Sequence, residues 1–470
     1  MILFSGCRGA ALTKTDTRWD HAVVIGGSYA GLLTAHALAD HFDRVTVLER
    51  DQVEVGTEYH AGVPQARHPH LLLAKGAQLL EARFPGLRAE LAGLGAPVYD
   101  FGTGVRYLVH GGLTPRAELG ITMQSVSRAT LERVIRRRVL AHRAITLVPG
   151  FTVDGLQLET VSRSITGLTG HAHGPDRRPG QQQRIEADLV VDASGRTSRL
   201  PEWLAGVGLQ QPVEQVVDGR LSYASRFVRL PEDTERDWQL TGSMPFPPDQ
   251  PRGGLVLALD GGQWVVSVFG SGGELPPTDE DGLRAYAESL PLPEIAKALA
   301  VGEPLAPLYR SSGLVNRWRH YHRLARWPDR LLVVGDAFCA FNPIYAQGMT
   351  VAALQAELLG ALLSTTTTPN RLGRRFQRAA GRLVHTPWSL ATGSDRPWSG
   401  QPSPLGARLA RAYLARVFEL MAIDPEVYRR FIAVQNMVAA PATLLAPALV
   451  GRVLRQALPR PRRTVLDLLD

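Results

Sequence analysis

The sequence predicts a mixed α/β fold that combines a Rossmann-type unit, an additional β-sheet and a helical C-terminal region. Residues 21–49 give apolar HAVVIG, then GSYAGLLTAHALADH with helical apolar spacing, then β-branched RVTVLE, which is the strand–helix–strand order of a Rossmann unit. Between residues 215 and 270 the pattern changes to strands, including GLVLALD and QWVVSVFG, which a glycine turn joins into a hairpin. From about residue 400, amphipathic helical spacing prevails.

These patterns divide the 470 residues into regions. We expect a discontinuous Rossmann-type domain at residues 20–215 and 325–365, with a β-sheet substrate domain inserted at 216–324. Residues 366–470 are expected to form a C-terminal helical region, and residues 1–19 a flexible N-terminal extension. No internal repeat is visible, so a solenoid or propeller is not expected.

Individual elements have their own signals. LLLAKGAQLLEARF predicts a helix that Pro85 ends, and SRATLERVIRRRVLAH predicts another with Ser127 as its N-cap. Asp424 and Pro425 form an N-cap and first-turn pair. Short strands are expected from about 145 to 191, interrupted by HAHGPDRRPGQQQR, which we interpret as a mobile hairpin loop with solvated histidines.

Composition restricts the functional class and the compartment. The net charge of +8 would suit an anionic partner, but the arginines are scattered and no nucleic-acid-binding motif surrounds them, so we expect no nucleic-acid partner. Two cysteines, Cys7 and Cys339, are too few for a disulfide framework and favour a cytoplasmic location. No signal peptide and no transmembrane segment are predicted.

The first motif is a glycine fingerprint in VVIGGSYAGLL. Gly26 permits a tight strand-to-helix turn, Gly31 permits close packing of helix and strand, and Ser28 stands where the middle glycine normally lies. By itself this pattern is equally compatible with an ordinary tight turn. Glu49 ends the second strand, where a carboxylate would accept hydrogen bonds from ribose hydroxyls, and this favours FAD or NAD over NADP.

Two later stretches discriminate between these cofactors by family resemblance. They are ADLVVDASGRTSRL, with Asp192, Gly195 and Ser198, and LLVVGDAFCAFNPIYAQGMTVAALQA, with Gly335, Asp336, Pro343 and Gly348. Together with the fingerprint and SRATLE around Arg128, they resemble the flavoprotein monooxygenases of the para-hydroxybenzoate hydroxylase fold. Within that group, GVPQARHPHLLLAKGAQLLEARFPGL is most similar to the bacterial FAD epoxidases of polyether-antibiotic pathways. The resemblance spans about residues 20 to 360.

The resemblance implies FAD as the cofactor and assigns residues to it. Glu49 would bind the adenosine ribose, Arg128 the adenosine or pyrophosphate part, and Asp336 the ribitol chain, whereas Gly348 and Met349 would offer backbone N–H groups to the flavin. The complete expected set is Gly26, Ser28, Ala30, Gly31, Glu49, Arg50, Arg67, Arg128, Asp336, Pro343, Gly348 and Met349. For Asp336 the alternative is an ordinary turn cap. DASG departs from the more common GADG, and no second fingerprint appears. We therefore expect the electron donor to be NAD(P)H that visits transiently or a partner flavin reductase.

Our hypothesis is that the protein is an FAD-dependent monooxygenase of antibiotic biosynthesis. It would use dioxygen, through a flavin hydroperoxide, to epoxidise a carbon–carbon double bond. The substrate would be a large apolar molecule that resembles a polyene or a polyketide. The flavin carries the chemistry, so no catalytic side chain is assigned. Tyr223, Ser225 and Phe227 share one strand face and are expected to line the substrate pocket or to belong to the core. Alternatives are aromatic hydroxylation, prenyl-chain reduction and a non-catalytic FAD-binding protein.

Two further features have more than one interpretation. His68 and His70 invite a metal assignment, but no other ligand has suitable spacing, so we expect a loop beside the cofactor and no metal. The stretch FIAVQNMVAAPATLLAPALVGRVL is expected to pack on the core, with peripheral membrane contact as the alternative. Halogenation is less favoured, because W-x-W-x-I-P is absent and Lys75 lies outside the spacing of the halogenase lysine.

Overall fold

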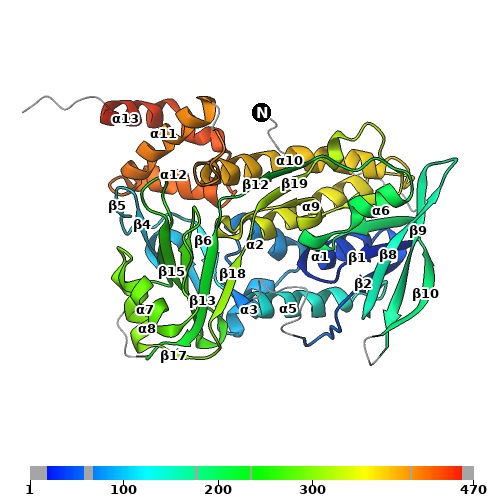
Figure 1. Ribbon diagram of the computed structural model, residues 1–470, viewed down its shortest axis with the longest axis horizontal. Coiled ribbons are helices and arrows are strands. Elements are labelled where there is room, and N and C mark those ends of the chain that lie inside the picture. Colours follow the sequence, from blue (N-terminus) through cyan, green and yellow to red (C-terminus); the bar gives the residue numbers. More distant parts are fainter. Residues whose placement is uncertain (1–17, 58–66, 175–177, 233–235, 403–404, 458–470) are drawn as a thin grey trace, which may run out of the picture.

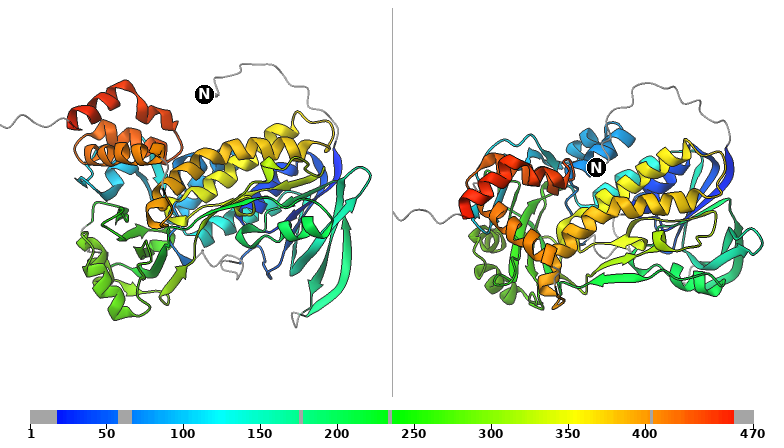
Figure 2. Two further views of the ribbon diagram at one scale, coloured as in Figure 1. Left: turned by 45° about the horizontal axis from the view of Figure 1, so that its top comes forward. Right: turned by 90° about the horizontal axis from the view of Figure 1, so that it is seen from above.

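The structure is a computed structural model and describes residues 18–57, 67–174, 178–232, 236–402 and 405–457. Of the extension expected at residues 1–19, only the last two are described, and Trp19 already begins the first strand. Figures 1 and 2 show an elongated molecule with the antiparallel strands β9 and β10 at one end and the C-terminal helices at the other.

A five-stranded parallel sheet forms the Rossmann core. Its order is β20 (Leu331–Val333), β11 (Leu189–Asp192), β1 (Trp19–Ile25), β2 (Phe42–Glu49) and β7 (Ile145–Pro149). Strands β11 and β20 are buried throughout and β1 at every position except Asp20, which explains their near-continuous apolar sequences. This confirms the predicted Rossmann-type fold class.

Helices and a β-meander cover this sheet. The helices are α1 (Tyr29–Leu38), α5 (Arg128–Leu140), α6 (Leu200–Gly206), α9 (Gln347–Leu363) and α10 (Leu372–Asp395). The meander consists of β8 (Phe151–Glu159), β9 (Ser164–His173) and β10 (Pro179–Glu186). It contacts the parallel sheet through β8 on β2 and β9 on β11, while α1 packs against α9 and α9 against α10 (Figure 1).

The interpretation of HAHGPDRRPGQQQR as a mobile loop is wrong for most of its length. Strand β9 continues to His173 and β10 begins at Pro179. His171 hydrogen-bonds Asp154 at 2.9 Å and His173 hydrogen-bonds Thr152 at 2.7 Å, so cross-strand partners hold both histidines. Polar pairs across the hairpin support strands that lack an apolar alternation.

An eight-stranded sheet, called the second sheet below, forms the core of the second domain. Its path is β17 (Glu303–Pro304), β13 (Ser222–Arg229), β16 (Trp264–Gly270), β15 (Arg252–Ala258), β14 (Leu240–Ser243), β4 (Val105–Val109) and β5 (Gly112–Leu113), and β18 (Tyr309–Ser312) also pairs with β13. The predicted hairpin is confirmed as β15 and β16, with Gly261 and Gly262 in positive-φ turn conformations. Strands β4 and β5 come from the range 20–215, so this sheet extends beyond the expected insertion at 216–324. Helices α7 (Glu280–Glu288) and α8 (Pro293–Val301) cover its outer face.

Smaller elements join the two parts. They are α2 (Ala74–Arg83), α3 (Leu87–Gly93), α4 (Phe101–Gly104), the pair β3 (Val98–Asp100) and β6 (Thr122–Gln124), and the sheet β12 (Glu214–Val217), β19 (Asn316–Arg319) and β21 (Cys339–Ala340). The predicted Ser127 cap of α5 is confirmed, because its hydroxyl accepts a hydrogen bond from the Thr130 N–H at 3.2 Å.

The C-terminal region contains α11 (Leu405–Met421), α12 (Pro425–Gln435) and α13 (Pro447–Ala457) beside β4 and β5 (Figure 1). Asp424 caps α12 as predicted. Val427 and Ile432 of α12 are buried in one apolar cluster with Phe101 and Leu257, so this helix packs on the second sheet. Across the described residues, none of the helices has the length and apolar character needed to span a bilayer.

Candidate active site

The turn between β1 and α1 requires glycine at two positions. Gly26 has a φ of +105°, and a Cβ there would lie 2.6 Å from the carbonyl oxygen of Ala193. A Cβ on Gly31 would lie 1.8 Å from the Gly26 oxygen. Ser28 is the N-cap residue of α1 but makes no side-chain cap bond, so the first N–H groups of the helix stay available to an anion. Ala30 lies in this first turn.

The carboxylate of Glu49 lies beside the same turn. This side chain is buried at the end of β2, and its oxygens accept hydrogen bonds from the backbone N–H of Gly27 at 2.7 Å and of Asp51 at 2.9 Å. Arg50, the next residue, is exposed and lies 3.9 Å from the carboxylate of Asp51. Of these neighbours, Glu49 is therefore the one positioned against the glycine turn.

A buried ionic network connects the start of α1 to α5. The Ser28 hydroxyl donates to Glu132 at 2.9 Å, and Arg128 donates to both Ser28 and Glu132 at 3.2 and 3.0 Å. Arg136 donates to the second oxygen of Glu132 at 2.9 Å. The guanidinium of Arg128 also lies 5.0 Å from the ring centre of Tyr29. Two arginines around one glutamate leave positive charge where α1 begins.

Sequence reasoning assigned no role to Glu132. It belongs to the SRATLE motif, and its spacing of four residues from Arg128 and from Arg136 is the available signal, since such pairs meet on one helix face. The carboxylate fixes the orientation of Arg128, so its contribution to the site is positioning.

The segment after β20 meets α1 from the other side. Gly335 has a φ of +60°, and its Cβ would lie 2.8 Å from the Cβ of Ala30. The next residue, Asp336, pairs with Arg196 at 3.3 Å, and a Cβ on Gly348 would meet only an Asp336 oxygen, at 3.8 Å. Asp336 and the start of α9 are thus neighbours with open space between them, and Met349 is buried behind them.

The DASG motif provides the partner of Asp336. Arg196, in the turn after Gly195, also donates to the carbonyl oxygens of Val315 and Phe341. Asp192 is fully buried and accepts hydrogen bonds from Ser194 and from the Ser198 hydroxyl, the latter at 2.5 Å. Burial raises the pKa of Asp192. This motif therefore holds a turn and directs Arg196 toward Asp336.

A second buried network holds the loop that leads into α9. The Tyr345 hydroxyl donates to Asp395 at 2.5 Å, and the side-chain amides of Asn342 and Asn316 donate to the other Asp395 oxygen at 2.9 and 2.6 Å. Burial raises the pKa of Asp395. The network joins β19, the end of α10 and residues 342–346, which include Pro343. No pattern in the sequence indicates these long-range partners.

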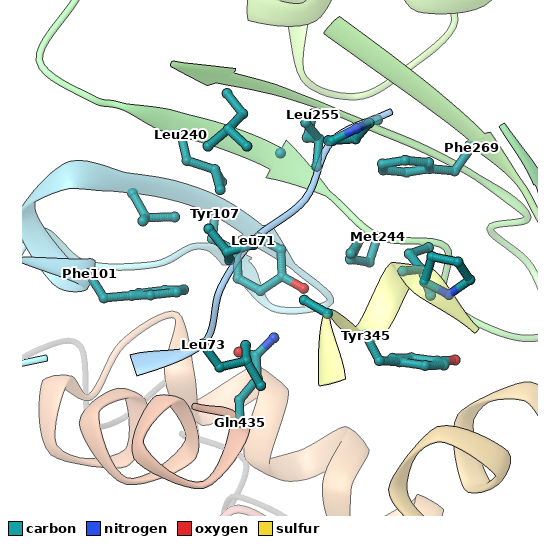
Figure 3. Close-up of a pocket in the computed structure, with 18 of the residues that line it drawn as sticks. Leu71, Leu73, Phe101, Tyr107, Leu240, Met244, Leu255, Phe269, Tyr345 and Gln435 are labelled. Carbon is teal, nitrogen blue, oxygen red and sulfur yellow. The ribbon is translucent and has the colours of Figure 1, made fainter. Parts of the chain in front are cut away.

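An apolar cavity lies between that loop and the second sheet (Figure 3). It is lined from α4, β4, β13, β14, β15 and β16, from residues 69–73, from residues 343–346 and from the end of α12. Its volume is about 100 Å³, and it is partly open to solvent. Leucines, phenylalanines and a methionine contribute the large apolar side chains of the wall, and the described lining residues include no charged side chain. The cavity therefore suits an apolar ligand.

The residues expected on one face of β13 have different surroundings. Tyr223 lines the cavity. Ser225 and Phe227 do not belong to its lining: the Ser225 hydroxyl bonds His68 at 2.9 Å and Ser267 at 2.8 Å, and Phe227 is part of an apolar core. The shared face is retained, but the strand leaves the cavity after Tyr223.

The loop with Arg67, His68 and His70 lies beside β13, and His68 is the buried residue of the three. Arg67 is exposed and lies over the ring of Tyr309 at 5.1 Å. The His68 ring contacts Tyr223 edge-on at 4.4 Å, and His70 hydrogen-bonds the His68 carbonyl oxygen at 3.0 Å. Burial lowers the pKa of His68 to about 4 and that of His70 to about 3, so both rings are neutral near pH 7. Among the described residues, no group of three histidine, cysteine or acidic side chains forms a metal site.

Solved structures share this architecture over nearly the whole chain. The flavoprotein/dehydrogenase from Cytophaga hutchinsonii has a TM-score of 0.66 at 16% identity and covers 93% of this chain and 99% of its own. The p-nitrophenol 4-monooxygenase PnpA from Pseudomonas putida DLL-E4 has a TM-score of 0.63 at 18% identity, with 89% and 98% coverage. The anhydrotetracycline hydroxylase OxyS from Streptomyces rimosus has a TM-score of 0.58 at 19% identity, with 90% and 77% coverage. The protein therefore has the para-hydroxybenzoate hydroxylase-like fold.

A nearer relative exists at the level of sequence. Protein Rv3254 of Mycobacterium tuberculosis is 32% identical over 451 residues, which is 93% of this chain and 94% of the relative. The chain belongs to the family of Protein Rv3254. No protein-family model matches it.

Proposed function

We propose that this protein binds FAD along α1, β2, α5 and α9 and is a monooxygenase that adds one oxygen atom to an apolar substrate. One observation carries the proposal: residues 343–346 wall the apolar cavity and lead directly into α9, whose Gly348 lies beside Asp336. A cofactor cradle and a substrate cavity therefore share one loop. The two neighbours named as a monooxygenase and a hydroxylase support this reaction class.

The residues of the cradle fit the chemical groups of FAD. The start of α1 and the guanidinium of Arg128 would hold the diphosphate, because uncapped N–H groups and a cation favour an anion. Glu49 would accept hydrogen bonds from ribose hydroxyls, and Asp336 from the ribitol chain. Gly348 leaves room for a ring system, since a Cβ there would meet only Asp336 within 4 Å.

When bound and reduced, FAD supplies the activation of dioxygen and the transfer of one oxygen atom. The chain itself binds and orients the substrate and excludes water from the reacting atoms. Phe101, Leu240, Leu255 and Phe269 form the dry wall of the cavity. Asp395 keeps Tyr345 and its loop in place through the hydrogen bonds described above.

The cavity favours epoxidation of a carbon–carbon double bond over hydroxylation of a phenol. Hydroxylation of a phenol is assisted by a base that removes the phenolic proton, whereas an alkene carries no such proton. No histidine, lysine, arginine or acidic side chain occurs among the described residues that line the cavity. An alkene therefore suits this wall better.

A polyene or polyketide chain would occupy more than the cavity. With a volume of about 100 Å³, the enclosed space holds only part of such a molecule, and the remainder would extend through the part that is open to solvent. The electron source and the location are proposed from the sequence alone. The electron source is NAD(P)H or a partner flavin reductase, and the location is the cytoplasm.

The cofactor proposal is tested by titrating purified protein with FAD and following the visible spectrum. Asp336→Ala is expected to weaken FAD binding at least about tenfold, because a hydrogen bond from the ribitol chain to a partly buried carboxylate would be lost. Asp249→Ala, an exposed substitution in the second domain, is the matched control and should bind FAD as the native protein does. Native protein that stays colourless with excess FAD contradicts the proposal.

The reaction is tested separately by incubating reduced holoprotein with apolar alkenes under ¹⁸O₂. Incorporation of one labelled oxygen atom into an epoxide is the expected result. A product that gains two hydrogen atoms would identify a prenyl-chain reductase. Bound FAD that is inert toward oxygen would identify a binding protein.

A further inference from the structure

The polar side chains of the cavity fall into two groups. Tyr345 donates to Asp395, Asn436 accepts from the Ala74 N–H and donates to the Ile432 oxygen, and the Tyr223 hydroxyl has Ser311 as its hydrogen-bonding neighbour. Each of these three side chains has a hydrogen-bond partner within the protein. Gln435 and Tyr107 line the same cavity and behave differently.

Gln435 ends α12 and its amide points into the cavity (Figure 3). Its Oε1 atom is shielded from solvent and has no hydrogen-bond partner among the described residues. A shielded amide oxygen without a partner is costly and uncommon in folded proteins, so the position of this Oε1 atom favours a partner that arrives from outside.

Tyr107 belongs to β4 and lines the same cavity. Its hydroxyl forms no hydrogen bond with any side chain or backbone group that the structure describes, and its ring is surrounded by the apolar wall. Burial raises the pKa of Tyr107, so its hydroxyl stays neutral and able to donate. The cavity thus offers one amide and one hydroxyl within an otherwise apolar surface.

The character of a matching ligand group follows from the wall. A charged group would lose its hydration without gaining an opposite charge, because the described lining residues carry none. A neutral hydroxyl or carbonyl would satisfy the amide and the phenol at little cost, whereas a pure hydrocarbon would leave both unpaired.

We infer that Gln435 and Tyr107 are specificity-determining residues that bind one neutral hydroxyl or carbonyl group of an otherwise apolar substrate. The inference rests on the proposed function, because the bound molecule is a substrate only if the protein is a monooxygenase. We call Gln435 and Tyr107 the polar anchor. By fixing one end of the ligand, the polar anchor restricts the part of the molecule that reaches residues 343–346.

Binding of matched probe pairs tests the anchor without any turnover. Limonene and perillyl alcohol, and naphthalene and 2-naphthol, differ by one hydroxyl group and are measured by calorimetry or equilibrium dialysis on oxidised protein. The native protein should bind at least one hydroxylated member about tenfold more tightly than its hydrocarbon, which corresponds to one or two neutral hydrogen bonds. Gln435→Met and Tyr107→Phe should each reduce this preference to about threefold or less while hydrocarbon binding is retained.

The controls separate recognition from folding. Tyr286→Phe removes another buried hydroxyl, which donates to the backbone oxygen of Phe269, and should leave the preference unchanged because Tyr286 itself is not among the lining residues. Gln435→Met should keep or raise the unfolding temperature, because it removes a shielded amide oxygen that has no partner among the described residues. A lower unfolding temperature would reveal a structural role and overturn the inference.

Equal affinity within every pair, including failure of all probes to bind, also overturns the inference. These outcomes are independent of the cofactor, since binding of the probes needs no FAD chemistry. Protein that lacks FAD but prefers the hydroxylated probes retains the polar anchor and refutes only the monooxygenase proposal.

Discussion

The lack of a side chain at Gly31 permits the tight turn of the proposed cofactor site. The helix α1 approaches β1 so closely that a Cβ on Gly31 would lie 1.8 Å from the backbone oxygen of Gly26. Because the obstacle is backbone at a tight turn, no side-chain rotation relieves it. The cost of such overpacking is typically about 1–3 kcal/mol.

We therefore expect Gly31→Ala to lower the free energy of unfolding by about 2 kcal/mol or more and to weaken FAD binding. Urea unfolding followed by circular dichroism measures the first effect. Gly206→Ala is the matched control, since Gly206 also lies in a helix and a Cβ there has no neighbour within 4 Å. If both variants unfolded alike, the close approach of α1 to β1 would be refuted.

Some residues of the candidate site could be predicted from the sequence, and others could not. Gly26, Gly31 and Glu49 lie at fixed spacings within one βαβ unit, so their neighbourhood is predictable from local order along the chain. Asp395 accepts a hydrogen bond from Tyr345, and Gln435 lines the cavity. Both positions depend on tertiary packing that brings distant segments of the chain together. No periodicity encodes such contacts, and a polar residue in a predicted helix is indistinguishable from a solvated one.

At the scale of elements, α2 depends on a cap that is supplied from the far end of the chain. Its own N-cap residue, Leu73, has no side chain able to accept a hydrogen bond. Instead Asn436 accepts from the Ala74 N–H with its side chain at 3.0 Å and from the Lys75 N–H with its backbone oxygen at 3.2 Å. The sequence predicted this helix, but its start at Ala74 follows from α12 packing against it.

Asn436→Ala is accordingly expected to lower the free energy of unfolding by about 1–2 kcal/mol, the usual effect of losing an N-cap. Asn436→Asp keeps the accepting oxygen and should recover part of that loss, while Asn370→Ala, at an exposed asparagine, serves as the control. Chemical denaturation of the three variants decides the matter. An unchanged stability of Asn436→Ala would show that α2 needs no cap from α12.

Element boundaries are the other part that sequence patterns missed. The parallel strands were recognisable because both of their faces are buried and their sequences are apolar throughout. Strands β4 and β5 are short and half-buried, and β4 joins the second sheet through parallel pairing with β14. That pairing is non-local, so the range 20–215 alone gave no sign of it.

At the scale of the whole molecule, burial of histidines links stability to pH. Burial lowers the pKa of six side chains, namely His21, His36, His68, His70, His320 and His322. The unfolded chain binds protons at these sites below about pH 6.5. In the folded protein the lowered pKa is about 4 for His36, His68, His320 and His322 and about 3 for His70. Stability is therefore expected to fall as the pH decreases through this window.

The expected loss between pH 7.5 and pH 5.0 has an upper limit of about 2 kcal/mol for each fully buried histidine, since one pKa unit corresponds to about 1.36 kcal/mol. Urea unfolding at both pH values measures it. In His68→Asn the loss should shrink by about 1–2 kcal/mol relative to the native protein, because His68 is buried against Ser225 and Tyr223 and stays neutral in the folded state. His385→Asn, at an exposed position on α10, should show the native loss. An identical pH dependence in all three proteins would mean that His68 is protonated alike in the folded and unfolded chain, and the buried contact of its loop with β13 would then be refuted.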